Sequence, residues 1–147
     1  MTPPNLKDDL LKKILKSAKT VAMVGVSSAK EENRASIKRR PSIIVMEYLQ
    51  EFGYKVIPVN PFSVGKKISG ELTFSKLEDI KTPVDLVNVF RPSDETPVIA
   101  NQAVTIGAKV LWLQFGIQNE KTQQIAESSN ITYIANRCIK QEYQRLF

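Results

Sequence analysis

Small and polar residues follow five short apolar runs of this sequence. Their side chains could bind a ligand or take part in a reaction. The runs are 21–26, 55–59, 84–89, 109–113 and 131–134, and the residues after them include Ser27, Ser28, Asn60, Arg91, Gln114 and Cys138. Hydroxyl, amide and guanidinium groups hold an anion through hydrogen bonds. They are not a general acid and base pair. The pattern therefore favours binding over catalysis.

Catalytic and metal chemistry have few candidates. The sequence contains no histidine, which excludes Ser-His-Asp and Cys-His systems, histidine metal sites and phosphohistidine. Few carboxylates follow the apolar runs. Asp85 stands at the beginning of the run 84–89 and therefore at the opposite end of the expected sheet. We therefore predict neither a catalytic residue nor a metal. Cys138 has two interpretations: a small buried hydrophobic residue, or a thiol near the site that Arg137 activates.

The apolar runs must be positioned by a sheet. Val21 to Val26 has almost no polar side chain, which is typical of a strand buried on both faces. Gly25 lets the backbone turn sharply there and lets a phosphate approach free N–H groups. Helical segments alternate with the runs. This predicts an α/β fold: a doubly wound parallel sheet of five to six strands with helices on both faces, in three layers. Its ligand is expected at the carboxyl ends of the strands.

Two segments flank the first run. Residues 5–19 have apolar side chains on one stripe and lysines opposite, which predicts an N-terminal helix, within 1–20, that covers the sheet. The stretch 27–40 is polar, with four basic residues between Arg34 and Arg40. It is interpreted either as a solvated loop or as a phosphate clamp.

Local signals predict how the later elements begin and end. Pro58 cannot donate within a central strand, so we expect it at the end of the strand 55–59. Ser75 and Glu78 have the spacing of a capping box for a short helix. Ser93 is expected to cap the next helix, from which Val98 should point inward.

Length and charge limit the class of protein. The 147 residues fit one domain, 1–147, and their net charge of +6 favours an anionic partner. No apolar run is long enough to span a membrane, and one cysteine cannot form an internal disulfide. We therefore expect a cytoplasmic protein that does not bind membranes.

The first turn differs from the common nucleotide motifs. A dinucleotide fingerprint needs three spaced glycines, and an acid after the second strand. This chain offers Gly25 alone, and Asn60 follows its second strand. NAD binding is therefore disfavoured, and the P-loop pattern is absent.

Taken together, these motifs resemble the stand-alone CoA-binding domain family, which is similar to the CoA-binding domain of the succinyl-CoA synthetase alpha subunit. The match covers about residues 20–146. The motifs are Val24-Gly-Val-Ser27, Arg40-Pro-Ser42, Gly53-Tyr-x-Val-x-Pro-Val-Asn-Pro61, Val84-Asp-x-Val-x-Val-Phe-Arg91, Trp112-x-Gln-x-Gly116 and Arg137-Cys138. Two positions depart from the family pattern: residues 29–32 lack the usual proline, and Asn136 replaces an aspartate.

The resemblance implies a Rossmann-like domain that binds coenzyme A (CoA) or an acyl-CoA. It places the phosphates at the turn of Gly25, Val26, Ser27 and Ser28, and a cleft at Arg40, Asn60, Pro61, Phe90 and Arg91. The far wall would hold Gln114 and Gly116, with Cys138 nearby. Synthetases also need a phosphorylated histidine and further domains, so ligase activity is not implied.

Three functions stay open. The leading hypothesis is a CoA-binding protein without catalytic machinery, which acts as a sensor, a carrier or a module for a partner enzyme. The alternative is a CoA-linked transferase or thiol-exchange enzyme that uses Cys138. The third is a nucleic-acid-binding protein that uses the basic loop 34–40, disfavoured by the modest charge and few aromatic residues. A protein partner or a homo-oligomer is compatible with each.

Overall fold

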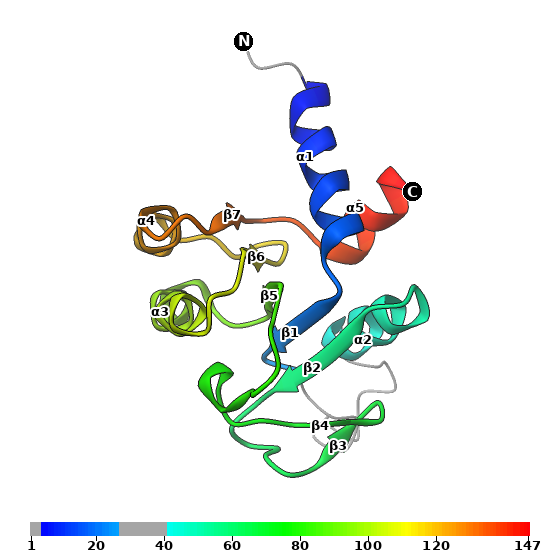
Figure 1. The fold of residues 1–147 in the computed structure, drawn as a ribbon, viewed down its shortest axis with the longest axis vertical. Helices are drawn as coiled ribbons and strands as arrows, with labels where there is room; N and C mark the ends of the chain where they lie inside the picture. The colour runs from blue at the N-terminus through cyan, green and yellow to red at the C-terminus, as the bar shows by residue number, and fades with distance from the viewer. Residues whose placement is uncertain (1–3, 27–40) are drawn as a thin grey trace.

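Five parallel strands form the centre of the molecule. The computed structural model describes residues 4–26 and 41–147. The sheet order is β2-β1-β5-β6-β7 (Figure 1). The strands are β1 (Thr20–Val24), β2 (Lys55–Val59), β5 (Leu86–Val89), β6 (Val110–Leu113) and β7 (Thr132–Ile134). The order reverses between β1 and β5, where ligands of such sheets bind. The predicted doubly wound parallel sheet is confirmed.

Helices cover both faces of the sheet (Figure 1). On one face α1 (Pro4–Ser17), α2 (Pro41–Glu51) and α5 (Ile139–Leu146) share a core with Val21 and Met23. On the other, α3 (Thr96–Ile106) and α4 (Glu120–Ser128) pack with Ala22. Because neighbouring residues of β1 enter opposite cores, the strand has to be apolar throughout. The predicted covering helix and three layers are confirmed.

The prediction that Pro58 lies at the end of its strand is wrong. Pro58 is the fourth of the five residues of β2. Its carbonyl accepts the N–H of Phe74 at 3.0 Å, on the side away from β1. The nitrogen of Pro58 faces the same side, so no ladder hydrogen bond is lost. The edge position of β2 therefore accommodates the proline. The hairpin β3 (Lys67–Ile68) and β4 (Glu71–Leu72) precedes Phe74.

Three further local predictions are wrong. Ser75 caps no helix: a single 3-10 turn, η2 (Leu77–Asp79), follows Lys76 without a side-chain cap. Ser93 also caps none, because it opens the 3-10 turn η3 (Ser93–Glu95), and α3 begins at Thr96. This shifts the buried stripe of α3, and Val98 is 62% exposed.

The amino end of the sheet is closed by Asp85. Its Oδ2 accepts the N–H groups of Lys19 and Thr20, at 2.9 and 3.0 Å. Burial raises the pKa of Asp85, but these hydrogen bonds and the charges of Lys109 and Lys19 together outweigh burial and hold the pKa below its usual value. Asp85 therefore has a structural role at the end of the sheet opposite to the carboxyl ends. Within residues 4–26 and 41–147, no helix has the length and apolar character needed to cross a bilayer.

Candidate functional site

Gly25 lies at the point where the strand order reverses. Its φ is +96°, and a Cβ placed on it would lie 2.8 Å from the carbonyl oxygen of Phe90 and 2.9 Å from Cδ of Arg91. Gly25 N–H donates to Val59 at 2.9 Å, and Phe90 N–H donates to Val24 at 2.8 Å. Only glycine fits this conformation and this close approach. The turn is thus held against both neighbouring strands.

A charged hollow of about 550 Å³ opens on the β2 side of this turn. Its lining includes Gly25, Asn60, Pro61, Phe62, Ser75, Lys76, Arg91, Asp94, Glu95 and Val98. Val98 is exposed because it faces this hollow rather than the core. Basic and acidic side chains meet here, so the hollow can bind both phosphate and hydroxyl groups of a ligand.

Asn60 is a buried side chain in the lining of the charged hollow. Only 7% of the residue is exposed. Its Nδ2 donates to the carbonyl of Val26 at 2.7 Å, and its Oδ1 accepts the N–H of Phe62 at 2.8 Å. The side chain therefore joins the chain after β1 to the chain after β2. Its main role in this structure is to hold the two exits together.

Arg91 is already paired at the rim of the charged hollow. Its Nε and Nη2 donate to the two carboxylate oxygens of Glu95 at 3.0 and 2.9 Å. Both side chains are partly exposed, so solvent weakens this pair. A phosphate that binds Arg91 has to replace Glu95 or share the guanidinium with it.

An apolar hollow of about 520 Å³ lies on the other side, towards α5. Its lining is Pro41, Val45, Phe90, Gln114, Phe115, Ile117, Cys138 and Gln141, and none of these described residues is charged. Phe90 and Arg91 are consecutive, yet they line different hollows. The single cleft expected from the sequence is therefore divided in two at the end of β5.

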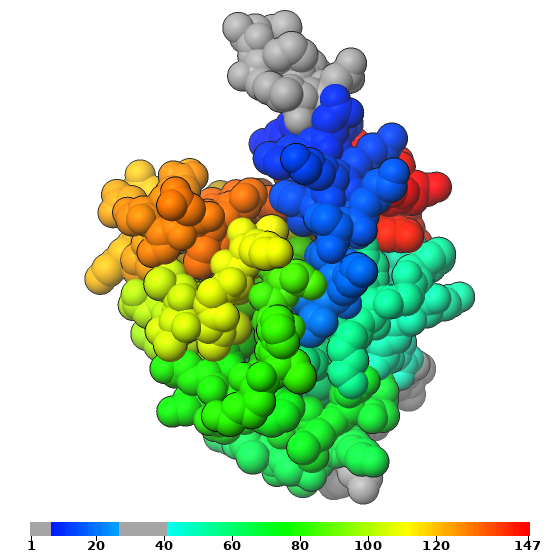
Figure 2. Space-filling view, in the orientation of Figure 1, coloured from blue at the N-terminus to red at the C-terminus, as the bar shows by residue number. Residues whose placement is uncertain are grey.

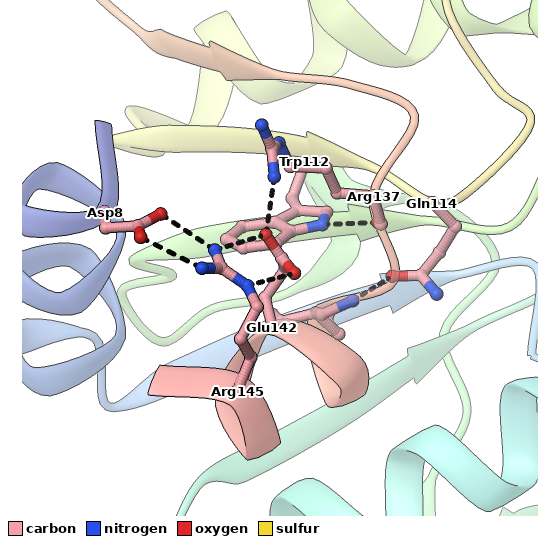
Figure 3. Close-up of polar contacts among 7 residues, drawn as sticks. Asp8, Trp112, Gln114, Arg137, Glu142 and Arg145 are labelled. Atoms are coloured by element: carbon pink, nitrogen blue, oxygen red, sulfur yellow. Dashed lines mark hydrogen bonds and ion pairs between the residues drawn. The ribbon is translucent and has the colours of Figure 1, made fainter. Parts of the chain in front are cut away.

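Gln114 is a buried amide at the base of the apolar hollow, with 5% exposure. Its Oε1 accepts Nδ2 of Asn88 at 2.9 Å and the N–H of Ile139 at 3.0 Å. Its Nε2 has no hydrogen-bond partner among the described residues (Figure 3). One end of the amide thus anchors the start of α5, and the other end can donate to a ligand.

The guanidinium of Arg137 is paired with Glu142 rather than with Cys138. Its Nη1 donates to Oε1 of Glu142 at 2.6 Å, and Arg145 binds the same carboxylate (Figure 3). Burial raises the pKa of Glu142, but the hydrogen bonds from Arg145 and Arg137 outweigh it and hold the pKa below its usual value. The prediction that Arg137 activates Cys138 is not supported, because Glu142 neutralises the guanidinium.

The same network fastens the loop that carries Cys138. The carbonyl of Arg137 accepts Nε1 of the buried Trp112 at 2.8 Å. Arg145 reaches across to Asp8 of α1, with contacts of 2.8 and 2.9 Å (Figure 3). Figure 2 shows α1 and α5 side by side at one end of the molecule. The loop before α5 is thus held from the sheet and from α1.

Gly116 lines neither hollow. Its N–H donates to Oδ1 of Asn136 at 2.7 Å, and Asn136 N–H donates to the carbonyl of Ile117 at 3.0 Å. Asn136 therefore supplies the acceptor oxygen that an aspartate would supply, as the neutral amide. Gly116 does not line the apolar hollow itself, but it belongs to the turn that places Phe115 and Ile117 in the lining of that hollow.

The structure brings most predicted site residues to the two hollows. Gly25, Asn60, Pro61 and Arg91 line the charged hollow, and Phe90, Gln114 and Cys138 line the apolar one. Val26 is fully buried beneath them. Ser27, Ser28, Arg40 and the basic loop 34–40 lie outside the described residues.

Sequence reasoning missed Phe62 and Phe115, which are 83% and 75% exposed in the two hollows. Each stands within three residues of the end of a strand, which was the available signal. In the described part of the chain, no three acidic, cysteine or histidine residues gather as metal ligands.

Comparison with known proteins finds a matching family and similar chains. The family described as CoA binding domain matches residues 19–144. The uncharacterized protein YneT of Bacillus subtilis (strain 168) is 35% identical over 130 residues, which are 88% of this chain and 89% of YneT. A Thermus thermophilus structure, cell-free ID.343, is 34% identical with a TM-score of 0.86, and the match covers 95% of this chain and 98% of that one.

A larger protein shares the fold alone. The dinucleotide-forming acetyl-coenzyme A synthetase 1 of Ca. Korarchaeum cryptofilum has a TM-score of 0.64 at 21% identity. The match covers 80% of this chain but 26% of the synthetase. The family match spans nearly the whole chain and includes both hollows. The chain belongs to the CoA-binding domain family.

Proposed function

We propose that this protein binds CoA or an acyl-CoA across the two hollows and performs no catalytic step on it. The observation that carries the proposal is the contrast between the hollows, one charged and one apolar, on either side of the Phe90–Arg91 exit. CoA has the same two parts: an anionic nucleotide and a long, neutral arm that ends in a thiol. One ligand of this chemistry occupies both.

The nucleotide part occupies the charged hollow. Arg91 binds a phosphate through its planar fork of donors once Glu95 gives way. Lys76 adds a second cation, and the carboxylate of Asp94 accepts a ribose hydroxyl. Gly25 lines this hollow at the end of β1, and the phosphates approach the chain there.

The arm occupies the apolar hollow. Phe90 and Ile117 pack against its methylene groups, and Nε2 of Gln114 donates to one of its amide carbonyls. The thiol or acyl end then lies near Cys138. No described residue that lines the apolar hollow carries a carboxylate, so the described part of the chain offers the acyl end no general base.

A sensor, a carrier or a module for a partner enzyme fits this arrangement. Such a protein holds CoA reversibly and passes it on, and the sequence has no histidine for the phosphohistidine step of a ligase. The single cysteine suits a reducing cytoplasm, where we place the protein. A nucleic-acid function finds no support among the described residues, since its only candidate is the loop 34–40.

Calorimetric titration with CoA and acetyl-CoA tests the proposal. We expect saturable binding of one ligand to each chain and a higher melting temperature. Arg91→Gln weakens the binding. Lys121→Gln, which removes the same charge from an exposed position of α4, leaves it unchanged. No heat of binding and no change in melting temperature at about millimolar ligand overturn the proposal.

A further inference from the structure

Cys138 is the only cysteine of the chain, and it stands where the apolar hollow meets α5. It is the residue immediately before the first turn of that helix, with φ −83° and ψ 119°, and it caps no N–H with its side chain. It is partly exposed rather than fully buried. The thiol is thus accessible from a hollow in which no described residue carries a charge.

A second group in the hollow points independently to a ligand. Gln114 is 95% buried, since its exposed fraction is 5%. Its Oε1 is occupied by Asn88 and Ile139, so its Nε2, which has no partner among the described residues, is the end left for the hollow. Nε2 is not among the fully buried atoms that lack a partner, so solvent reaches it from the hollow and a ligand acceptor can replace that water.

We propose that Cys138 captures the thiol end of CoA by thiol–disulfide exchange with a disulfide of CoA. The proposal rests on the proposed function, because the arm in the apolar hollow brings the sulfur to Cys138. The co-reactant is CoA disulfide, or a mixed disulfide of CoA with another small thiol. The product is a chain that holds CoA covalently and reversibly.

The exchange balances without a further oxidant. Cys138 gives its proton to solvent, and its thiolate attacks the sulfur of the bound CoA half. The new S–S bond forms as the old one breaks, and the departing thiolate takes up a proton. The oxidised state moves from the small disulfide to the protein, so no net oxidation occurs. Attack by a second thiol on the mixed disulfide releases CoA and restores the cysteine.

Intact-protein mass spectrometry measures the rate of this modification on the full chain. Because prior binding places the two sulfurs together, CoA disulfide reacts faster than glutathione disulfide by about tenfold or more. Desulfo-CoA, which lacks the thiol, competes for the apolar hollow. It therefore slows the reaction with CoA disulfide and leaves the reaction with glutathione disulfide unchanged. Cys138→Ser acquires no adduct. In denaturant the two disulfides react at equal rates.

Two variants of α5 locate the reaction. Gln141 is exposed and lines the apolar hollow, whereas Gln144 is exposed on the next turn and does not. Gln141→Trp fills the entrance and removes the preference for CoA disulfide, and Gln144→Trp keeps it. Equal rates for the two disulfides on the folded chain overturn the capture. If desulfo-CoA binds in calorimetry in that case, the proposed function stands. If it does not bind, the proposed function fails as well.

Discussion

A Cβ atom on Gly25 would lie 2.8 Å from the carbonyl oxygen of Phe90, where the order of the strands reverses. Gly25→Ala is therefore expected to destabilise the fold by about 2–4 kcal/mol, from the positive φ together with the clash. It also weakens CoA binding, because the turn has to move. Urea unfolding and calorimetry measure the two effects.

Gly70→Ala is the matched control for that variant. Gly70 has a similar φ of +85°, but no atom lies within 4 Å of its Cβ position. Its cost is therefore the backbone strain alone, about 1–2 kcal/mol. Equal losses of stability for the two variants would contradict a role for the Gly25–Phe90 approach.

Glu95 competes with the ligand for Arg91. Glu95→Gln is expected to tighten CoA binding by about three- to fivefold, since an exposed ion pair is worth up to about 1 kcal/mol. The melting temperature of the free protein should hardly change. Glu78→Gln removes a carboxylate from an exposed position of η2 that lines neither hollow, and it serves as the control. Weaker binding to Glu95→Gln would show that Glu95 contacts the ligand favourably.

Glu142 links stability to pH. Its pKa in the folded protein lies below the ordinary value of 4.5, because the hydrogen bonds from Arg145 and Arg137 outweigh burial. The folded state therefore binds fewer protons than the unfolded state in this range. Its stabilisation is present above about pH 4.5 and is lost as the pH falls towards the folded pKa.

The variant Glu142→Gln tests this linkage by urea unfolding over a pH series. It is expected to cost about 2–3 kcal/mol at neutral pH, because two arginines lose a shared carboxylate. Its loss of stability relative to the parent protein should shrink as the pH falls below about 4. A difference that stays constant with pH would exclude titration of Glu142 as the cause.

Tyr54 gives the opposite pH dependence. Burial raises the pKa of Tyr54 to about 12, and its hydroxyl donates to the carbonyl of Leu15 in α1. The folded state keeps this proton longer than the unfolded state, so the stabilisation is lost as the pH rises from about 10 to about 12. Tyr54→Phe should reduce that slope, because Tyr48 and Tyr133 also have raised pKa values, and it should cost about 1 kcal/mol below about pH 10. Urea unfolding of the parent protein and of Tyr54→Phe over a pH series measures the slope and the cost, and tyrosinate absorbance follows the ionisation.

The strands and the turn of Gly25 could be predicted because an uninterrupted apolar run has few alternatives to a doubly buried strand. Helix starts were harder. Ser93 has the right type for a cap, but Thr96 Oγ1 donates to the Ser93 carbonyl and a 3-10 turn forms first. The stripe of α3 then rotates, and Val98 faces the charged hollow. Local sequence does not decide between these starts.

The site could be predicted as a set of residues but not as two spaces. Phe90 and Arg91 are neighbours in sequence, and only the completed sheet shows that they line opposite hollows. Arg137 stands beside Cys138 in sequence, whereas its guanidinium binds Glu142 at the start of the following helix. Such choices depend on packing that distant segments supply.

The ion pair between Asp8 and Arg145 joins residues 137 positions apart. In folding terms, this is a contact of very high sequence separation, and closing so large a loop is slow and entropically costly. The last turns of α5 and α1 pack on the same face of the sheet, so they dock once the strands beneath them have assembled. The loop with Cys138 is therefore completed late, and a chain still in synthesis has no finished apolar hollow.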